Sequence, residues 1–98
     1  MELSSKQKAY LKGIGNGLDD IVKVGDNGVT PSVVKSLEEA LTARELVKIS
    51  VNSRDRDYRK QAVEELVLQT GAKLVSIKGK TALIFRENPE NRQISAKL

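Results

Sequence analysis

Two glycines three residues apart, Gly25 and Gly28, enclose the dipeptide Asp26-Asn27 between an apolar strand-like run and the start of a predicted helix. Glycine permits positive φ and lets another backbone come close. A helix N-terminus presents unpaired N–H groups and the positive end of a dipole, which favour an anion. The segment could therefore cradle a phosphate backbone, with Asn27 and the N–H of Val29 as donors. G-x-x-G alone also marks many ordinary turns, so this alternative stays open.

Basic residues outside this loop could supply the charge that a phosphate cradle needs. The chain carries a net charge of +4, a mild bias toward polyanions. Residues 73–86 contain four basic residues and no acid, and two further lysines lie one helical turn apart near the N-terminus. A solvated face with no partner is the alternative for such scattered lysines. The candidate nucleic-acid contacts are Gly25, Asp26, Asn27, Gly28, Lys8, Lys12, Lys23, Lys78, Lys80 and Arg86.

Catalysis has little support in the residue types. The chain has no cysteine and no histidine, which removes the thiolate nucleophile and the commonest general base at neutral pH. Asp19-Asp20 and Glu64-Glu65 are adjacent pairs, and adjacent side chains point in different directions on a helix or strand. No phosphate-loop lysine motif is present. We expect no enzyme, no metal and no cofactor.

No apolar run approaches the roughly 20 residues that span a bilayer. The N-terminal residues lack the apolar core of a signal peptide. Nothing resembles a coiled-coil seam. We therefore expect a cytoplasmic monomer without membrane contact.

The spacing of apolar residues, together with residues typical of helix ends and turns, predicts three helices and four strands. Ser4 or Ser5 can cap a first helix, Thr30 and Pro31 suit the start of a second, and Gly71 suits the end of a third. The tight segment 78–80 predicts a hairpin. The strands are expected at 21–24, 46–51, 72–77 and 81–86.

This order, α-β-α-β-α-β-β, predicts a single α/β domain with a mixed four-stranded sheet. Each strand–helix–strand unit implies a parallel pairing with a right-handed crossover, and the final hairpin adds an antiparallel pair. We expect the domain to occupy residues 1–87 and to be followed by a flexible polar tail, 88–98.

Several blocks of the sequence together resemble one known family. The segment "VKVGDNGVTPSVVKSLEEALTARELVKISV", an Arg/Asp-rich link and then "TGAKLVSIKGKTALIFR" resemble a CRM domain, named for chloroplast RNA splicing and ribosome maturation. The similarity runs from about Leu3 to Arg86. A single copy of this length resembles the stand-alone bacterial YhbY-like type.

The resemblance implies a fold similar to the C-terminal domain of translation initiation factor three. It implies that residues 25–28 form the RNA-contacting GxxG loop, and that the partner is ribosomal RNA in large-subunit precursors. One departure is Asp26, which stands where the family usually has a basic residue. Asp19 and Asp20 add further negative charge near the loop.

A second hypothesis is a protein-interaction module without direct RNA contact. Glu38, Glu39 and Glu45, with the Asp19-Asp20 pair, could dock a ribosomal protein or another basic partner. A solvated helix face is the alternative for these acids.

Overall fold

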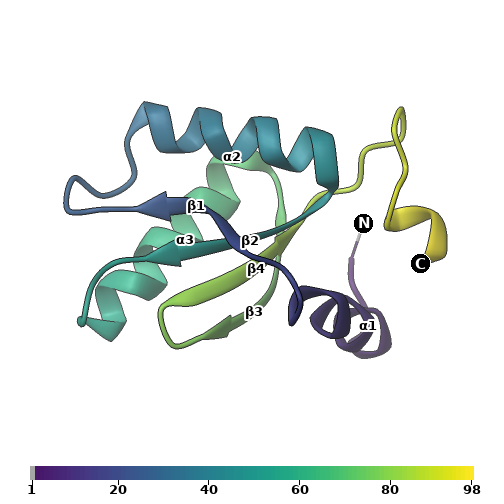
Figure 1. Cartoon of the computed structure of the whole chain (residues 1–98), viewed down its shortest axis with the longest axis horizontal. Helices are drawn as coiled ribbons and strands as arrows, with labels where there is room; N and C mark the ends of the chain where they lie inside the picture. The colour runs from purple at the N-terminus through teal and green to yellow at the C-terminus, as the bar shows by residue number, and fades with distance from the viewer. Residues whose placement is uncertain (1) are drawn as a thin grey trace.

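A four-stranded sheet organises the chain, with its strands in the order β1-β2-β4-β3 (Figure 1). The computed structural model describes residues 2–98. The elements are α1 (Ser5–Gly15), β1 (Asp20–Val24), α2 (Pro31–Arg44), β2 (Leu46–Val51), α3 (Arg56–Thr70), β3 (Lys73–Lys78), β4 (Thr81–Phe85) and a short 3₁₀ turn, Ser95–Lys97. The predicted α/β class and element order are confirmed.

The sheet is mixed, as predicted, but one expected pairing is wrong. β1 and β2 are parallel neighbours, whereas β2 and β3 do not pair with each other. β4 lies between them and is antiparallel to both. The hairpin folds β4 back into the gap, so the second crossover spans a strand rather than joining two neighbours.

The helices begin and end where the local chemistry predicts. Ser4 caps α1 through a capping box: its Oγ accepts from the Gln7 N–H at 3.1 Å, and the Gln7 side chain accepts from the Ser4 N–H. Thr30 caps α2, with Pro31 as its first residue. Gly71 ends α3 in the left-handed conformation, at φ 69°.

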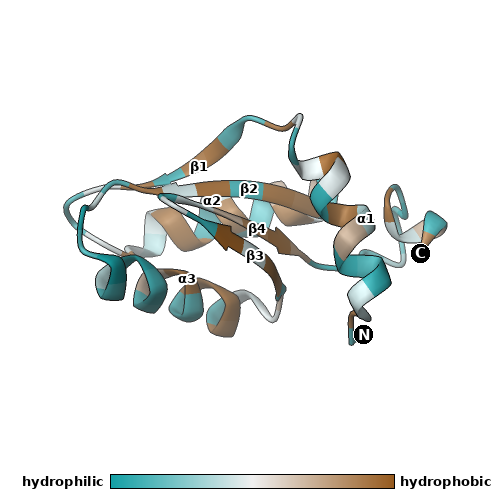
Figure 2. Cartoon of the chain, turned by 90° about the horizontal axis from the view of Figure 1, so that it is seen from below, coloured by the Kyte–Doolittle hydropathy of each residue, from teal (hydrophilic) through white to brown (hydrophobic). Residues whose placement is uncertain are grey.

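Alternation along the strands divides the core into two layers. On one face, Val22, Val24, Val47, Ile49 and Ile84 pack under α2 and α3. On the other face, α1 covers only part of the sheet, where Leu11 packs against Leu46, Val75, Leu83 and Phe85. Figure 2 shows hydrophobic strands between the helices and hydrophilic residues in the first turns of α3.

The tail, residues 88–98, makes specific contacts with the rest of the fold. Glu45 is fully buried, and its carboxylate accepts hydrogen bonds from the backbone N–H groups of Asn88, Gln93, Ile94 and Ser95 and from the Ser95 hydroxyl. Ile94 and Leu98 pack against the α1 layer. The tail therefore closes the end of the sheet that carries α1.

The opposite end of the sheet carries three loops. The ends of β1, β2 and β3 and the start of β4 meet there, because β4 alone runs in the reverse direction. Figure 1 shows the β1–α2 loop, the β2–α3 loop and the β3–β4 turn at this end, with α1 and both termini at the other. Within residues 2–98, no helix combines the length and apolar character needed to cross a membrane.

Candidate nucleic-acid interface

The β1–α2 loop forms a tight turn closed by its two glycines. The Gly28 N–H donates to the Gly25 carbonyl at 3.0 Å. Asp26 and Asn27 between them are exposed. The turn leads through Val29 to α2, whose Thr30 hydroxyl accepts from the Val33 N–H at 3.2 Å. The predicted strand–turn–helix context of the G-x-x-G segment is therefore present.

The structure separates the roles of the two glycines. Gly28 has φ +72°, and a Cβ there would lie 3.0 Å from the Tyr58 hydroxyl oxygen. Its place in the fold thus explains why it is glycine. Gly25 has no positive φ, and a Cβ there would have no neighbour within 4 Å. Nothing in the fold requires Gly25 to lack a side chain.

One side of the loop is acidic. A hollow of about 320 Å³ beside it is lined by Gly25, Asp26, Asn52, Ser53, Asp55 and Tyr58. Asp55 caps α3 and accepts from the N–H groups of Asp57 and Tyr58. A phosphate entering this hollow would meet the carboxylates of Asp26 and Asp55, so this side of the loop disfavours an anion.

The β3–β4 turn carries two of the predicted lysines at the same end of the molecule. Lys78 and Lys80 are exposed on either side of Gly79, which has φ +59°. Lys23 is also exposed, at the end of β1. Val22 and Val24 point into the α2–α3 layer, so Lys23 points to the opposite face of the sheet.

Three basic residues that the sequence analysis did not single out lie beside this turn. Arg56, Arg59 and Lys60 of α3 line a hollow of about 500 Å³ together with Ile77 and Gly79. Arg59 also donates to the Ser53 carbonyl at 2.9 Å. Their spacing of three and four residues places them on one helix face, and this signal could have identified them.

The lysines of α1 lie away from the three loops. Lys8 is half-buried near the N-terminus, close to the salt bridge between Lys73 and Glu2. Lys12 lies one turn further along α1 and reaches the uncovered part of the sheet. The structure therefore separates the predicted pair from the G-x-x-G turn.

Arg86, one of the predicted phosphate contacts, forms hydrogen bonds within the fold. Its guanidinium donates to Glu38 at 2.8 Å, to the Thr70 carbonyl at 2.9 Å and to the Thr42 hydroxyl at 3.1 Å. Arg86 follows β4, at the end of the sheet opposite the loops. These bonds tie β4 to α2 and to the end of α3, so the guanidinium is already occupied.

The acids proposed for protein docking do not form a free surface. Glu45 is buried and bound to the tail, and Glu38 is paired with Arg86. Asp20 lies against the sheet, where a hydrogen bond from the Ser50 side chain and one from its own N–H lower its pKa, with a smaller effect of Lys23 and Lys48. Asp19 and Glu39 remain exposed. Across residues 2–98, no group of three or more His, Cys, Asp or Glu side chains is arranged to hold a metal ion.

Comparison with known proteins adds to this geometry. A probable RNA-binding protein of Pseudomonas aeruginosa is 38% identical over 96 residues, which cover 97% of this chain and 92% of the relative. The probable RNA-binding protein YqeI of Bacillus subtilis is 37% identical over 92 residues, covering 94% and 96%.

A solved structure and a family model agree with these matches. The solution structure of a hypothetical Staphylococcus aureus protein, described as a candidate RNA-binding protein, superposes with a TM-score of 0.81 at 33% identity, covering 93% of this chain and 95% of that one. The model of the CRS1/YhbY (CRM) domain matches residues 3–86. With nearly its whole length matched, this chain belongs to the CRS1/YhbY (CRM) domain family.

Proposed function

We propose that this protein is an RNA-binding accessory factor that contacts ribosomal RNA in precursors of the large ribosomal subunit. The relatives named as RNA-binding proteins support the class of partner. The G-x-x-G turn and the lysine-bearing β3–β4 turn, which lie at one end of the sheet, support a polyanion as the ligand. The ribosomal target rests on the family resemblance alone.

The proposed mechanism is recognition of the sugar–phosphate chain by the low-bulk turn. Gly25 and Gly28 admit the RNA backbone close to the peptide N–H groups of the turn, and the N-terminus of α2 favours its charge. Lys23, Lys78 and Lys80 neutralise neighbouring phosphates. The chain has only three aromatic residues, so base stacking contributes little and sequence preference is weak.

Gly25 is the observation that carries this proposal. It is exposed, its φ is not positive and the space where a Cβ would stand is empty. A fold-based reason for glycine exists at Gly28 but not at Gly25. Close approach of a ligand backbone supplies the missing reason.

The protein acts, in this proposal, as a cytoplasmic monomer without a catalytic step. Residues 1–87 form the RNA-binding unit. The tail, 88–98, has a structural part, because Glu45 holds it against the layer formed by α1.

Ultraviolet crosslinking in cells, followed by sequencing of the attached RNA, tests the proposal. We expect enrichment of large-subunit ribosomal RNA and its precursor sequences over small-subunit RNA. Crosslinked RNA without that enrichment would remove the ribosomal assignment. Absence of crosslinked RNA, together with a basic protein partner that survives nuclease treatment, would instead support the docking-module hypothesis.

A further inference from the structure

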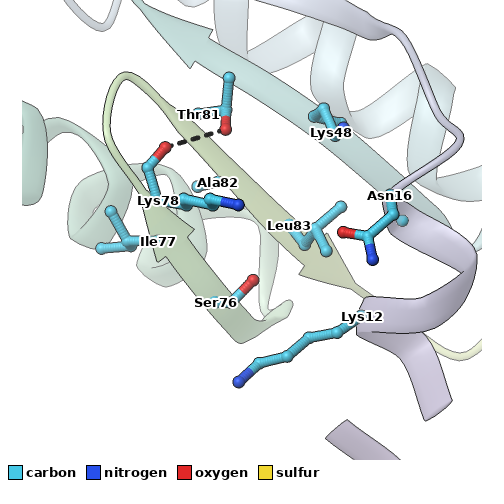
Figure 3. Close-up of a pocket in the computed structure, with 10 residues that line it drawn as sticks. Lys12, Asn16, Lys48, Ser76, Ile77, Lys78, Thr81, Ala82 and Leu83 are labelled. Carbon is cyan, nitrogen blue, oxygen red and sulfur yellow. Dashed lines mark hydrogen bonds between the residues drawn. The ribbon is translucent and has the colours of Figure 1, made fainter. Parts of the chain in front are cut away.

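A polar hollow lies on the face of the sheet that α2 and α3 do not cover. It has a volume of about 340 Å³. The end of α1, Lys48 of β2, residues 76–78 of β3 and residues 81–83 of β4 line it. The Leu83 side chain lies at its floor, and Asn16, Ser76 and Thr81 add polar groups to its lining. Figure 3 shows Lys12, Lys48 and Lys78 around it, each from a different element.

The close approach of α1 to the sheet creates this hollow. A Cβ at Gly15 would overlap the side chain of Leu83. Gly15 therefore lets the end of α1 rest directly on β4, and this contact places Asn16 at the edge of the hollow. Because α1 stops there, the rest of this sheet face stays uncovered.

The hollow is cationic. Its lining contains Lys12, Lys48 and Lys78 and no acid. Lys12 and Lys78 are exposed, whereas Lys48 is half-buried, in the middle of β2. In Figure 3, Lys78 points from β3 across the sheet and Lys12 reaches from α1 toward β3. Three ammonium groups from separate elements surround one small concave surface.

The same face continues toward the G-x-x-G turn. Lys23 pairs with Ser50 in the register of β1 and β2, and Lys48 lies two residues from Ser50 on the same face. Asp20 is an acid near this path, and it pairs with Lys48 in the register. Its carboxylate stays charged because its pKa is lowered by the hydrogen bond from the Ser50 side chain and, in part, by Lys23 and Lys48. The α3 side of the turn, by contrast, carries Asp26 and Asp55. The charge pattern thus directs a polyanion from the turn onto this face.

We infer that the hollow lined by Lys12, Lys48 and Lys78 is a second phosphate-binding subsite, which holds the backbone of RNA that continues from the G-x-x-G turn across the uncovered sheet face. This inference rests on the proposed function. The half-buried Lys48 stem packs along the sheet and keeps its ammonium group at the subsite. The ligand is an RNA phosphate, and the polar rim donates from Asn16 and Ser76, whereas the Thr81 hydroxyl donates to the Lys78 carbonyl.

Charge-neutral variants test the inference against a matched control on the same helix. Lys12→Gln and Lys48→Gln each remove one cation at the hollow, and Lys6→Gln removes an exposed cation of α1 that does not line it. The probe is a fluorescein-labelled stem–loop RNA, titrated at several salt concentrations. Thermal melting of each variant serves as the check on folding.

Each variant at the hollow is expected to weaken RNA binding about fivefold at about 0.1 M salt, because one released counterion contributes a slope of roughly 0.7. The slope of log K against log salt should fall by about 0.7 for each variant. Lys6→Gln should leave affinity and slope unchanged.

The outcomes separate this inference from the proposed function. Variants at the hollow that behave like Lys6→Gln, while Lys23→Gln/Lys80→Gln, at two exposed lysines outside its lining, still weakens binding, would overturn the subsite and keep the proposed function. A wild-type protein that does not bind the stem–loop RNA would overturn both. Weakened binding with an unchanged melting temperature supports the subsite.

Discussion

At the scale of single residues, the two loop glycines serve different purposes. Gly28 adopts φ +72° beside the Tyr58 hydroxyl, so its glycine serves the fold. Gly25 has neither constraint. A substitution at Gly28 therefore mixes a stability effect with any binding effect, whereas one at Gly25 reports on binding alone.

Gly28→Ala should lower the free energy of unfolding by about 1 kcal/mol, because a side chain is strained at positive φ. The Tyr58 hydroxyl must also move to admit the Cβ. Urea denaturation measures the change. Gly13→Ala is the control, since a Cβ at Gly13 in α1 meets nothing within 4 Å and should stabilise the helix. Equal stability of the Gly28→Ala variant and the wild type would contradict the assignment.

Glu45 is the other residue whose contribution to the free energy of unfolding can be predicted. Burial raises the pKa of Glu45. The hydrogen bonds from the tail, led by the Asn88 N–H and the Ser95 hydroxyl, lower this pKa by more than burial raises it, and the result is a pKa of about 2. The pKa in the unfolded chain is near the ordinary 4.5. The resulting stabilisation is fully present above pH 4.5 and is lost as the pH falls from there toward 2.

Glu45→Gln should remove that pH dependence. We expect roughly 3 kcal/mol of wild-type stability to disappear between about pH 5 and pH 2 through this group. The variant should lose a similar amount already at neutral pH, because an amide offers a donor where the tail presents donors. Denaturation curves across this pH range test the prediction, and parallel profiles for the two proteins would contradict it.

At the scale of elements, the β3–β4 turn offers a cationic projection that the fold does not need. The Lys80 carbonyl accepts from the Val51 N–H and the Lys78 carbonyl from the Thr81 hydroxyl, but both bonds are made by the main chain of the lysines. Their exposed side chains can therefore be changed without disturbing the turn.

Lys78→Gln/Lys80→Gln should weaken RNA binding about 25-fold at about 0.1 M salt, at roughly fivefold for each lost phosphate contact. Lys6→Gln/Lys97→Gln removes the same charge from exposed positions on α1 and the tail, and should leave affinity unchanged. Fluorescence anisotropy with one RNA measures both. Equal losses of affinity in the two double variants would show that binding depends on the net charge of the protein and not on the position of Lys78 and Lys80.

The elements themselves were largely predictable, since their signals are local. Ser4, Thr30 and Gly71 mark helix ends by their own chemistry, and segment 78–80 is too short for anything but a hairpin. Alternation along a strand reports which face is buried, not which strand lies beside it. The position of β4 between β2 and β3 was therefore missed.

The contacts of two residues singled out in the sequence could not be predicted for the same reason. Arg86 and Glu38 lie 48 residues apart in sequence, and Glu45 bonds to Ser95 across 50 residues. Charge patterning cannot reveal such pairs, so Arg86 was expected to be available and Glu45 to be solvated. The sequence shows Lys48 as a polar residue in an alternating strand. Only the structure shows that α1 leaves this part of the sheet uncovered, so that Lys48 lines a hollow there.

At the scale of the whole molecule, the distribution of charge matters more than its total. The net charge is only +4. The loop end and the uncovered sheet face carry Lys12, Lys23, Lys48, Lys78 and Lys80, whereas Arg86 and Glu45 are bound at the other end. Five lysines thus lie on the loop end and the uncovered sheet face of the molecule, with the acids Asp20 and Asp26 among them.

RNA affinity should fall steeply with salt. Five phosphate contacts, one for each lysine of this surface, predict a slope of about −3.5 for log K against log salt. Titrations from low to physiological salt measure it. A slope near zero would show that phosphate neutralisation is not the source of affinity.

The most direct test of the central claim is the RNA affinity of Gly25→Ala beside its unfolding free energy. The central claim is that Gly25 lacks a side chain so that the RNA backbone can come close, and not because the fold requires a glycine there. We predict that Gly25→Ala keeps wild-type stability and loses at least about fivefold in affinity, the loss of one phosphate contact, while Gly13→Ala keeps its affinity. Unchanged RNA binding by a folded Gly25→Ala protein would contradict the account.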